Sequence, residues 1–257
     1  MAKTIAVIPD TQCRPDESFE YLNHIGKYLV DKKPDIWVHL GDFLDFESLS
    51  SYDKGTKNFE GRRIIKDLDS GYKAMEALMA PLFEYNQRAR KNKEKQYKPE
   101  LHITLGNHCD RLTRIINEDP KLEGLISMDN LPFAKFGWTV HPFLQPLFID
   151  NIAFCHYFPS GVLGRPATTA SALVSKMHMS CIAGHQQGKQ VAYGKRPDGS
   201  TITCIIAGSC YIHDEKYLDF QSNKHWRGII FLHEVNNGSF DEMFVSLDYL
   251  KKRYNET

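Results

Sequence analysis

The chain has 257 residues, of which 42% are hydrophobic, and its 32 basic residues balance its 32 acidic residues. This composition allows one sizeable core or two small ones, and the balanced charge excludes a bulk attraction to nucleic acid or anionic membranes, although a local basic patch stays possible. No apolar run approaches the ~20 residues that span a bilayer, and the apolar stretch near the first residue is too short for a secretory signal. We therefore expect a protein that does not enter a membrane.

The six cysteines are scattered along the chain and form no CxxC pair. A chain that can build its own core does not need disulfide bonds for stability. We therefore expect reduced thiols that pack as small apolar side chains, and a cytoplasmic protein.

The first part of the chain alternates between predicted strands and predicted helices. Three short apolar runs are typical of buried strands, and the two stretches between them have apolar residues at helical spacing. The second helix ends in basic residues, which suit a helix C-terminus. This β-α-β-α-β order indicates an α/β fold with parallel strands. In chain order the predicted elements are a strand at 4–8, a helix at 17–31, a strand at 36–40, a helix at 62–91 and a strand at 101–105.

After about residue 136 the pattern changes to short strands and hairpins. Asp150 and Asn151 predict a tight hairpin turn between two of these strands. The charged stretch 88–98 is the best candidate for a domain boundary, but we interpret it as a helix end and a solvated loop within a single domain over residues 1–257. The remaining predicted elements are strands within 137–143, 146–150 and 151–158, a helix at 168–179, a strand at 181–184, hairpins over 189–208 and 228–247, and a helix at 247–253.

Polar residues follow successive predicted strands. The carboxyl ends of strands in open α/β sheets are where ligands bind, so we expect Asp10, Asp42, Asn107 and His185 to converge at one rim. Asp10, Asp42 and Asp45 cannot share a partly desolvated pocket without cations. Each residue alone could be a turn cap or a core histidine, but their ordered recurrence favours a metal site with mixed nitrogen and oxygen ligands. The segments are PDTQ at 9–12, GDFLD at 41–45, GNHCD at 106–110, His156 and GHQQ at 184–187.

The order of these segments resembles that of the calcineurin-like metallophosphoesterases. The family pattern runs D-x-H, GDxxD, GNH followed by an acid, a lone H, and GHxH, and this chain matches it in order from residue 10 to residue 187. The resemblance implies an α/β fold in which two packed mixed β-sheets are flanked by helices, an αββα sandwich. It also implies hydrolysis of a phosphoester by water at a pair of divalent metal ions, which neutralise charge on the phosphoryl oxygens.

The same resemblance implies a role for each matched residue. Asp42 would bridge the two metals and Asp10 would bind the first metal. Asn107, His156 and His185 would complete the second metal site.

His108 would contact the scissile phosphate and help to protonate the leaving group, and Asp45 would orient its imidazole. Asn107 would also contact the substrate. Asp110 lies one place after the acid of the family pattern, so we assign it no role.

Two glutamines depart from the family pattern, and both fall on the first metal site. Gln12 replaces the histidine of D-x-H, and Gln187 replaces the second histidine of GHxH. An amide oxygen can still bind a metal, but it suits hard cations better than Zn. Some DNA-processing and phage-encoded members of the family are similar in having this glutamine in D-x-H. We therefore expect one tight site and one weaker site, filled by Mn in the first instance, with Mg, Zn, Fe or Ni as alternatives.

The substrate is less constrained by the sequence. Arg111, Arg114 and Arg165 could each hold a phosphate oxygen or simply be surface residues. Monoesters, nucleotide diesters, nucleic-acid strands and phosphoproteins all stay open, and we expect a nucleotide or nucleic acid cleaved by a phosphodiesterase, phosphatase or nuclease. His213 and His225 lie in the irregular segment 209–226, which could hang over the rim, but structural or solvated histidines explain them better. The alternative is a non-catalytic scaffold that keeps a metal and binds a protein partner; the oligomeric state stays open.

Overall fold

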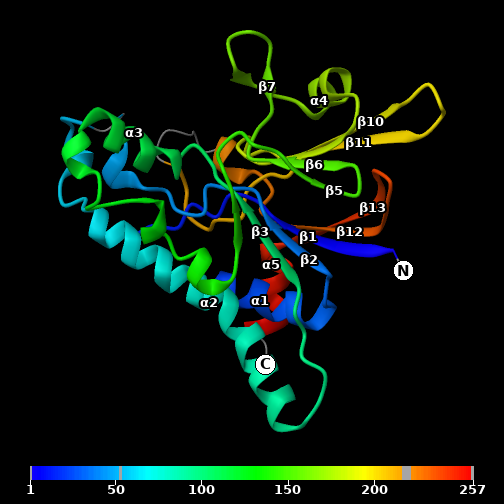
Figure 1. The fold of residues 1–257 in the computed structure, drawn as a ribbon, viewed down its shortest axis with the longest axis horizontal. Coiled ribbons are helices and arrows are strands. Elements are labelled where there is room, and N and C mark those ends of the chain that lie inside the picture. Colours follow the sequence, from blue (N-terminus) through cyan, green and yellow to red (C-terminus); the bar gives the residue numbers. More distant parts are fainter. Residues whose placement is uncertain (1, 52–53, 216–220, 256–257) are drawn as a thin grey trace.

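Two β-sheets packed face to face form the centre of the molecule, in a computed structural model that describes residues 2–51, 54–215 and 221–255 (Figure 1). The larger sheet has six strands in the order β13-β12-β1-β2-β3-β4. Strands β1 to β4 run parallel to one another, and β12 pairs antiparallel with both β1 and β13. Its strands are β1 (Lys3–Ile8), β2 (Ile36–His39), β3 (Glu100–Thr104), β4 (Thr139–His141), β12 (Gly228–Asn236) and β13 (Ser239–Ser246).

The second sheet has five strands in the order β10-β11-β9-β6-β5. Strands β6, β9 and β11 are parallel, whereas β5 and β10 pair antiparallel at the two edges. Its strands are β5 (Leu147–Ile149), β6 (Ile152–Cys155), β9 (Ser180–Ala183), β10 (Gln190–Lys195) and β11 (Thr201–Ile206), and a separate two-stranded ribbon joins β7 (Pro159–Ser160) to β8 (Arg165–Pro166).

Helices cover the outer faces of both sheets. Helices α1 (Glu20–Lys32), α2 (Ile64–Lys91) and α5 (Leu247–Asn255) lie on the side of the larger sheet, and α4 (Ala170–Met177) lies on the side of the smaller sheet (Figure 1). Helix α3 (Asp110–Glu118) follows β3. Six short 3-10 helices in the described residues complete the chain, at Glu47–Leu49, Lys57–Phe59, Pro120–Leu122, Met128–Asn130, Ala134–Phe136 and Ser222–Lys224.

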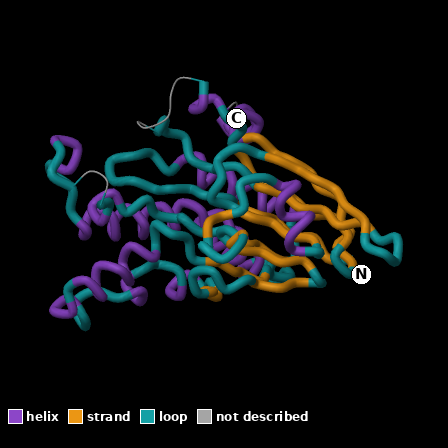
Figure 2. The backbone as a smooth tube through the Cα atoms, turned by 90° about the horizontal axis from the view of Figure 1, so that it is seen from above, coloured by secondary structure: helices purple, strands orange, loops and turns teal. Residues whose placement is uncertain are grey.

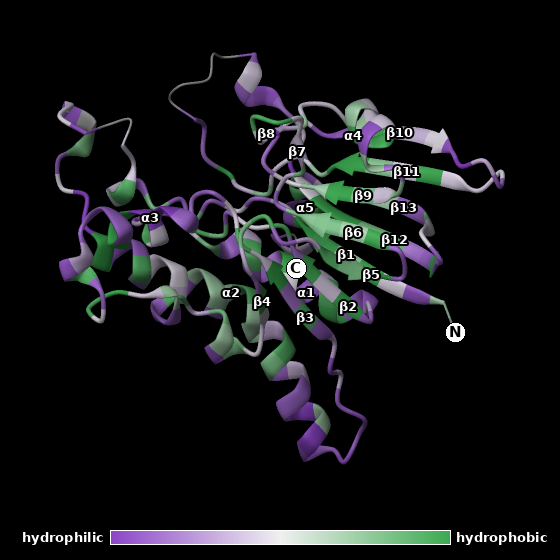
Figure 3. Ribbon diagram, turned by 45° about the horizontal axis from the view of Figure 1, so that its top comes forward, coloured by the Kyte–Doolittle hydropathy of each residue, from purple (hydrophilic) through white to green (hydrophobic). Residues whose placement is uncertain are grey.

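The side chains of β1 show how the sequence builds these layers. Successive residues of a strand point to opposite faces. Ile5 and Val7 therefore pack between the two sheets, whereas Ala6 and Ile8 pack against the helices. The apolar strands at the centre of the sandwich stand out by hydropathy in Figure 3. The structure thus confirms the predicted α/β fold of two mixed sheets flanked by helices.

The sequence located the main elements to within a few residues. The tight turn at Asp150 and Asn151 is confirmed, because both residues have positive φ, 46° and 60°. The first helix begins at Glu20 rather than at residue 17. The β7–β8 ribbon and the 3-10 helices had no periodic signal and were not predicted. In the described residues no helix combines the length and the apolar composition needed to cross a bilayer.

Candidate functional site

The candidate residues lie in the loops that leave the carboxyl ends of parallel strands. Asp10 follows β1, Asp42 follows β2, and His108 follows β3 in the larger sheet, whereas His156 and His185 follow β6 and β9 in the smaller one. Figure 2 shows the strands gathered toward one end of the molecule, with loops and short helices toward the other. The two sheets therefore deliver their polar residues to a shared edge.

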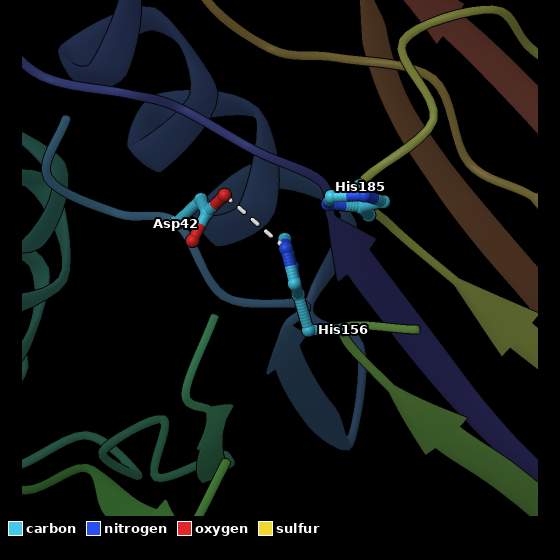
Figure 4. Close-up of side chains that lie close together, drawn as sticks. All are labelled: Asp42, His156 and His185. Atoms are coloured by element: carbon cyan, nitrogen blue, oxygen red, sulfur yellow. Dashed lines mark ion pairs between the residues drawn. The ribbon is translucent and has the colours of Figure 1, made fainter. Parts of the chain in front are cut away.

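Asp42, His156 and His185 form a group that could hold a metal ion. One ligand atom from each of these side chains lies within 4.8 Å of the others. Asp42 and His156 point toward each other (Figure 4), and Oδ2 of Asp42 is 3.1 Å from Nε2 of His156. Small shifts would bring all three within reach of one ion, whose ligands lie about 2.0–2.2 Å from it.

His156 is fully buried and oriented by the backbone of the other sheet. Its Nδ1 donates to the carbonyl oxygen of Leu40 at 2.9 Å, which turns Nε2 toward Asp42 and toward Oδ1 of Asn107, 2.8 Å away. Burial lowers the pKa of His156, but the charges of Asp42 and Asp10 outweigh it and raise the pKa to about 9. The proton on Nε2 of His156 therefore occupies the nitrogen lone pair through which this side chain would bind a cation.

His185 is the third member of this group and has the opposite electrostatic setting. Burial and the neighbouring His156 lower its pKa to about 4. Its ring stands edge-on to that of His156, with centroids 5.1 Å apart. A neutral imidazole at this position is ready to donate a lone pair to a metal.

Asp10 and Gln12 form the other half of the centre, and each has a buried oxygen without a hydrogen-bond partner among the described residues. These atoms are Oδ2 of Asp10 and Oε1 of Gln12. Burial, which exceeds the lowering effect of His156, raises the pKa of Asp10 to about 7. A buried oxygen without a partner costs about 1–3 kcal/mol, so both atoms fit a site for a cation. Gln187 is half-buried in the loop after β9, where its backbone lies beside Gly208.

The loops of the site pack the carboxylate of Asp42 directly against the backbone of Gly106. A Cβ on Gly106 would lie 2.0 Å from Oδ1 of Asp42, so only glycine fits there. Gln12, Asp42 and His185 adopt positive φ values of 40°, 46° and 65°. Residues other than glycine rarely adopt this backbone conformation, and residues strained in this way cluster at functional sites.

His108 and Asp45 form an acid–imidazole pair beside the metal-binding group. Nδ1 of His108 lies 2.8 Å from Oδ1 of Asp45, an ion pair that is not aligned as a straight hydrogen bond. The other nitrogen, Nε2, lies 3.8 Å from Oδ2 of Asp42. Burial lowers the pKa of His108, but the charges of Asp42 and Asp45 outweigh it and raise the pKa above its ordinary value. The two carboxylates therefore favour the protonated form of His108, which is the form that a proton donor needs.

The arginines near this pair differ in what they contact. Arg111 donates from Nη1 to the carbonyl oxygens of Asp45 at 2.7 Å and Phe46 at 3.3 Å. Arg114 donates to the carbonyl oxygen of Asn107 at 3.1 Å. Arg165 is exposed on β8 of the two-stranded ribbon. A role for Arg111 in binding phosphate would have to use its remaining guanidinium nitrogens.

Arg14 is a residue of the site that sequence reasoning missed. Its Nε donates to Oδ2 of Asp45 at 2.6 Å. The only signal in the sequence was its position two residues after Gln12, in the loop that follows β1.

The cysteines next to the motifs take no part in the site. All six cysteines are free and buried, as expected of small apolar side chains. Burial raises the pKa of the thiols of Cys13 and Cys109, each to about 12, so neither is a thiolate near neutral pH.

Comparisons with known proteins show which family the chain resembles. A family model for calcineurin-like phosphoesterases matches residues 3–191. The Gene 54 protein of Mycobacterium phage L5 is 43% identical over 192 residues, which are 72% of this chain and 69% of that protein. The Gene 54 protein of Mycobacterium phage D29 is 35% identical over 192 residues, with the same shares of both chains.

Two solved structures are more distant. Yfce, a phosphoesterase from E. coli, is 11% identical with a TM-score of 0.39, over 95% of this chain and 99% of that chain. A dimetal phosphatase from Danio rerio is 11% identical with a TM-score of 0.39, over 96% of this chain and 99% of that chain. The fold described above rests on the sheet topology of this chain itself. Because the family model covers most of the sequence and the phage proteins match over two thirds of their length, the chain belongs to the calcineurin-like phosphoesterase family.

Proposed function

We propose that this protein hydrolyses phosphoester bonds with the help of divalent cations, as a phosphodiesterase or phosphatase acting on a nucleotide or nucleic acid. The observation that supports this best is the His108–Asp45 pair, placed beside a group of side chains that can hold a metal. A protein that kept a metal only as a scaffold would have no need of a protonated imidazole at this rim.

Two neighbouring cation sites would share Asp42. His156, His185 and Asn107 would complete the nitrogen-rich site, and Asp10, Gln12 and Gln187 would complete the oxygen-rich one. When bound, divalent cations would polarise the phosphoryl oxygens and supply a nucleophile near neutral pH. Manganese suits this mixed set best, because it accepts both imidazole and carboxylate or amide ligands.

His108 would donate a proton to the leaving oxygen. Asp45 binds Nδ1, so the proton that is transferred sits on Nε2, which faces Asp42 and the centre. A protonated imidazole matches this task at neutral pH, since the two carboxylates raise its pKa. Asn107 and His108 would contact the phosphate from the loop after β3, and Arg111 and the exposed Arg165 are the proposed partners for other phosphate oxygens.

The single domain and the cytoplasmic location are also proposals. Leu22 of α1 and Leu250 of α5 lie in the same core cluster, which supports one folding unit from the first strand to the last helix. The six free thiols suit a reducing compartment. The phage origin of the two similar Gene 54 proteins supports action inside a host cell.

The test of this function is hydrolysis by the manganese-loaded protein of nitrophenyl monoesters and diesters, alongside single-stranded and double-stranded DNA. His108→Ala should lower turnover by roughly 10²–10⁴-fold, the range for loss of a general acid, while metal content stays the same. Esters with a good leaving group need less protonation and should lose less.

Two outcomes would count against these assignments. Equal losses on good and poor leaving groups would assign His108 to substrate binding instead. Absence of hydrolysis on every substrate by a protein that binds metal would favour the scaffold alternative.

A further inference from the structure

A chain of buried charges connects the His108–Asp45 pair to a segment far along the sequence. Nη2 of Arg14 donates to both carboxylate oxygens of Glu215, at 2.8 Å each, while its Nε donates to Asp45. The side chains of Arg14, Asp45 and Glu215 are only 13%, 7% and 5% exposed. Glu215 lies beyond residues 3–191, which the family model matches.

Glu215 is itself fixed from several sides. Its backbone N–H donates to Oδ1 of Asn223 at 2.8 Å, and Nδ2 of Asn223 donates to its carbonyl oxygen at 3.0 Å. Nε2 of His213 lies 3.2 Å from Oε1 of Glu215, and Nδ1 of His213 lies 3.0 Å from Oε1 of Glu17. The Glu215 carboxylate is thus a fixed anchor for Arg14 and not a mobile surface group.

The two oxygens of Asp45 are used by different partners. Oδ1 faces His108 at 2.8 Å and Oδ2 accepts from Arg14 at 2.6 Å. A carboxylate held at both oxygens cannot rotate without breaking one contact. The planar guanidinium suits this task because its nitrogens lie in a rigid fork that can bind two carboxylates at once.

The charges around Arg14 argue against a direct role in binding phosphate. Its guanidinium is paired with two buried carboxylates, and Oε1 of Glu47 lies 3.8 Å from its Nε. The Nε and Nη2 groups of Arg14 are thus already occupied by carboxylates of the protein itself. Arg14 therefore binds Asp45 and Glu215 rather than a substrate.

We propose that Arg14 and Glu215 are positioning residues for His108: Glu215 fixes Arg14, Arg14 fixes Oδ2 of Asp45, and Asp45 thereby keeps Oδ1 on the imidazole. This inference rests on the proposed role of His108 as proton donor. It makes Glu215, which follows β11, part of the site, although this residue lies outside the motifs of the family.

The test is a double-mutant cycle on the manganese-loaded protein with aryl phosphoesters of good and poor leaving groups. Arg14→Gln should lower kcat by roughly 10–100-fold on poor leaving groups, the range for partners that orient a reacting group, with KM and metal content unchanged. Glu215→Gln should lower kcat in the same pattern by on the order of 10-fold. In a His108→Ala background, both changes should cost nothing more, because the imidazole that they position is gone.

Two further variants sharpen the result. Arg14→Lys should not restore activity, since a point charge cannot span both carboxylates. Arg253→Gln is the matched control: Arg253 of α5 pairs with Asp31 at 3.4 Å and contacts none of these residues, so its change should leave kcat as it is.

A loss of the same size in the His108→Ala background would overturn the proposal, as would a rise in KM with kcat unchanged. If Arg14→Gln does not fold, the same double-mutant cycle can be measured with Glu215→Gln and His108→Ala. A crystal structure of either variant gives an answer without activity: Asp45 should turn away from His108, and a contact preserved at 2.8 Å would refute positioning. Absence of hydrolysis by the wild type would count against the proposed function, and the crystal structure would still decide this inference.

Discussion

The two halves of the candidate metal centre differ in their donor atoms and in how these atoms are satisfied. His156, His185 and Asn107 offer two imidazoles and an amide oxygen, and His156 already contacts both Asp42 and Asn107. Asp10 and Gln12 offer only oxygen atoms, and one oxygen on each is buried without a partner among the described residues. His156 is therefore oriented by hydrogen bonds within the protein, whereas the two buried oxygens of the second half have no such partner among the described residues.

This difference predicts different behaviour in solution. A site whose ligands already contact one another loses little freedom when an ion enters, so it should bind tightly. A site made of carboxylate and amide oxygens should prefer manganese or magnesium and should accept zinc poorly, because zinc gains most from imidazole. Three changes test this difference: removal of an imidazole from the nitrogen-rich half, addition of imidazoles to the oxygen-rich half, and replacement of a buried histidine that belongs to neither half.

The largest effect is expected from His185→Ala. Removing one of two imidazoles from the nitrogen-rich half should weaken manganese binding there by more than about 100-fold, beyond the 10–100-fold range for loss of an outer partner of a ligand. Metal analysis and calorimetric titration of the purified variant would measure this. The matched control is Gln186→Ala in the next position, which should keep the wild-type metal content. Unchanged stoichiometry and activity in His185→Ala would show that the ligand assignment is wrong.

An intermediate effect is expected from Gln12→His combined with Gln187→His. Each added imidazole should raise affinity at the oxygen-rich half by roughly 10-fold, about 1.4 kcal/mol, and the gain should be greater for zinc than for magnesium. Either change alone should do less, since one imidazole completes half of the missing set. Calorimetry with manganese, magnesium and zinc compares the variants with wild type.

Gln186→His is the control for adding an imidazole beside the site rather than in it. If the wild type already binds two ions with equally high affinity, the two halves do not differ as we expect. If the double variant still binds one ion, Gln12 and Gln187 do not face the cation.

The smallest effect concerns His39, a buried imidazole beneath the centre. Its Nδ1 accepts from the backbone N–H of Gly41 at 3.1 Å, and burial lowers its pKa from 6.5 to about 3. Between these two values the unfolded chain binds a proton that the folded protein excludes. The stability from His39 is therefore present above pH 6.5 and is lost as pH falls toward 3, by up to about 1.4 kcal/mol per pH unit.

His39→Asn keeps an acceptor for Gly41 and removes this titration. Urea unfolding at pH 6.5 and 5.5 should show a smaller fall in the free energy of unfolding for His39→Asn than for wild type, by about 1 kcal/mol. His178→Asn, at an exposed position with positive φ, should behave like wild type. Parallel pH dependence in all three proteins would mean that His39 is not held neutral by the fold.

The sequence predicted the parts of this molecule that depend on local pattern. Apolar runs located the strands, and glycine followed by a polar residue located several candidate ligands at their ends. The glycine is needed because the Asp42 carboxylate packs against Gly106 and leaves no room there for a side chain. The Arg14–Glu215 pair could not be predicted, since the two residues lie 201 positions apart and neither belongs to a recognisable motif. The donor-atom difference between the two halves was visible as glutamine in place of histidine, but the unsatisfied oxygens appeared only in three dimensions.

Residues that meet at the candidate metal centre lie far apart in the sequence, and this separation determines when the centre can form during synthesis. The backbone of His185 binds Asp10 across 175 positions, and Arg14 reaches Glu215 across 201. A nascent chain has therefore exposed Asp10 and Asp42 long before their partners have been translated. The proposed cation sites can therefore form only after most of the polypeptide has left the ribosome, and the proposed proton donor His108 is positioned by Glu215 later still. Contacts between residues so distant in sequence slow folding, so we expect the centre to form late in folding.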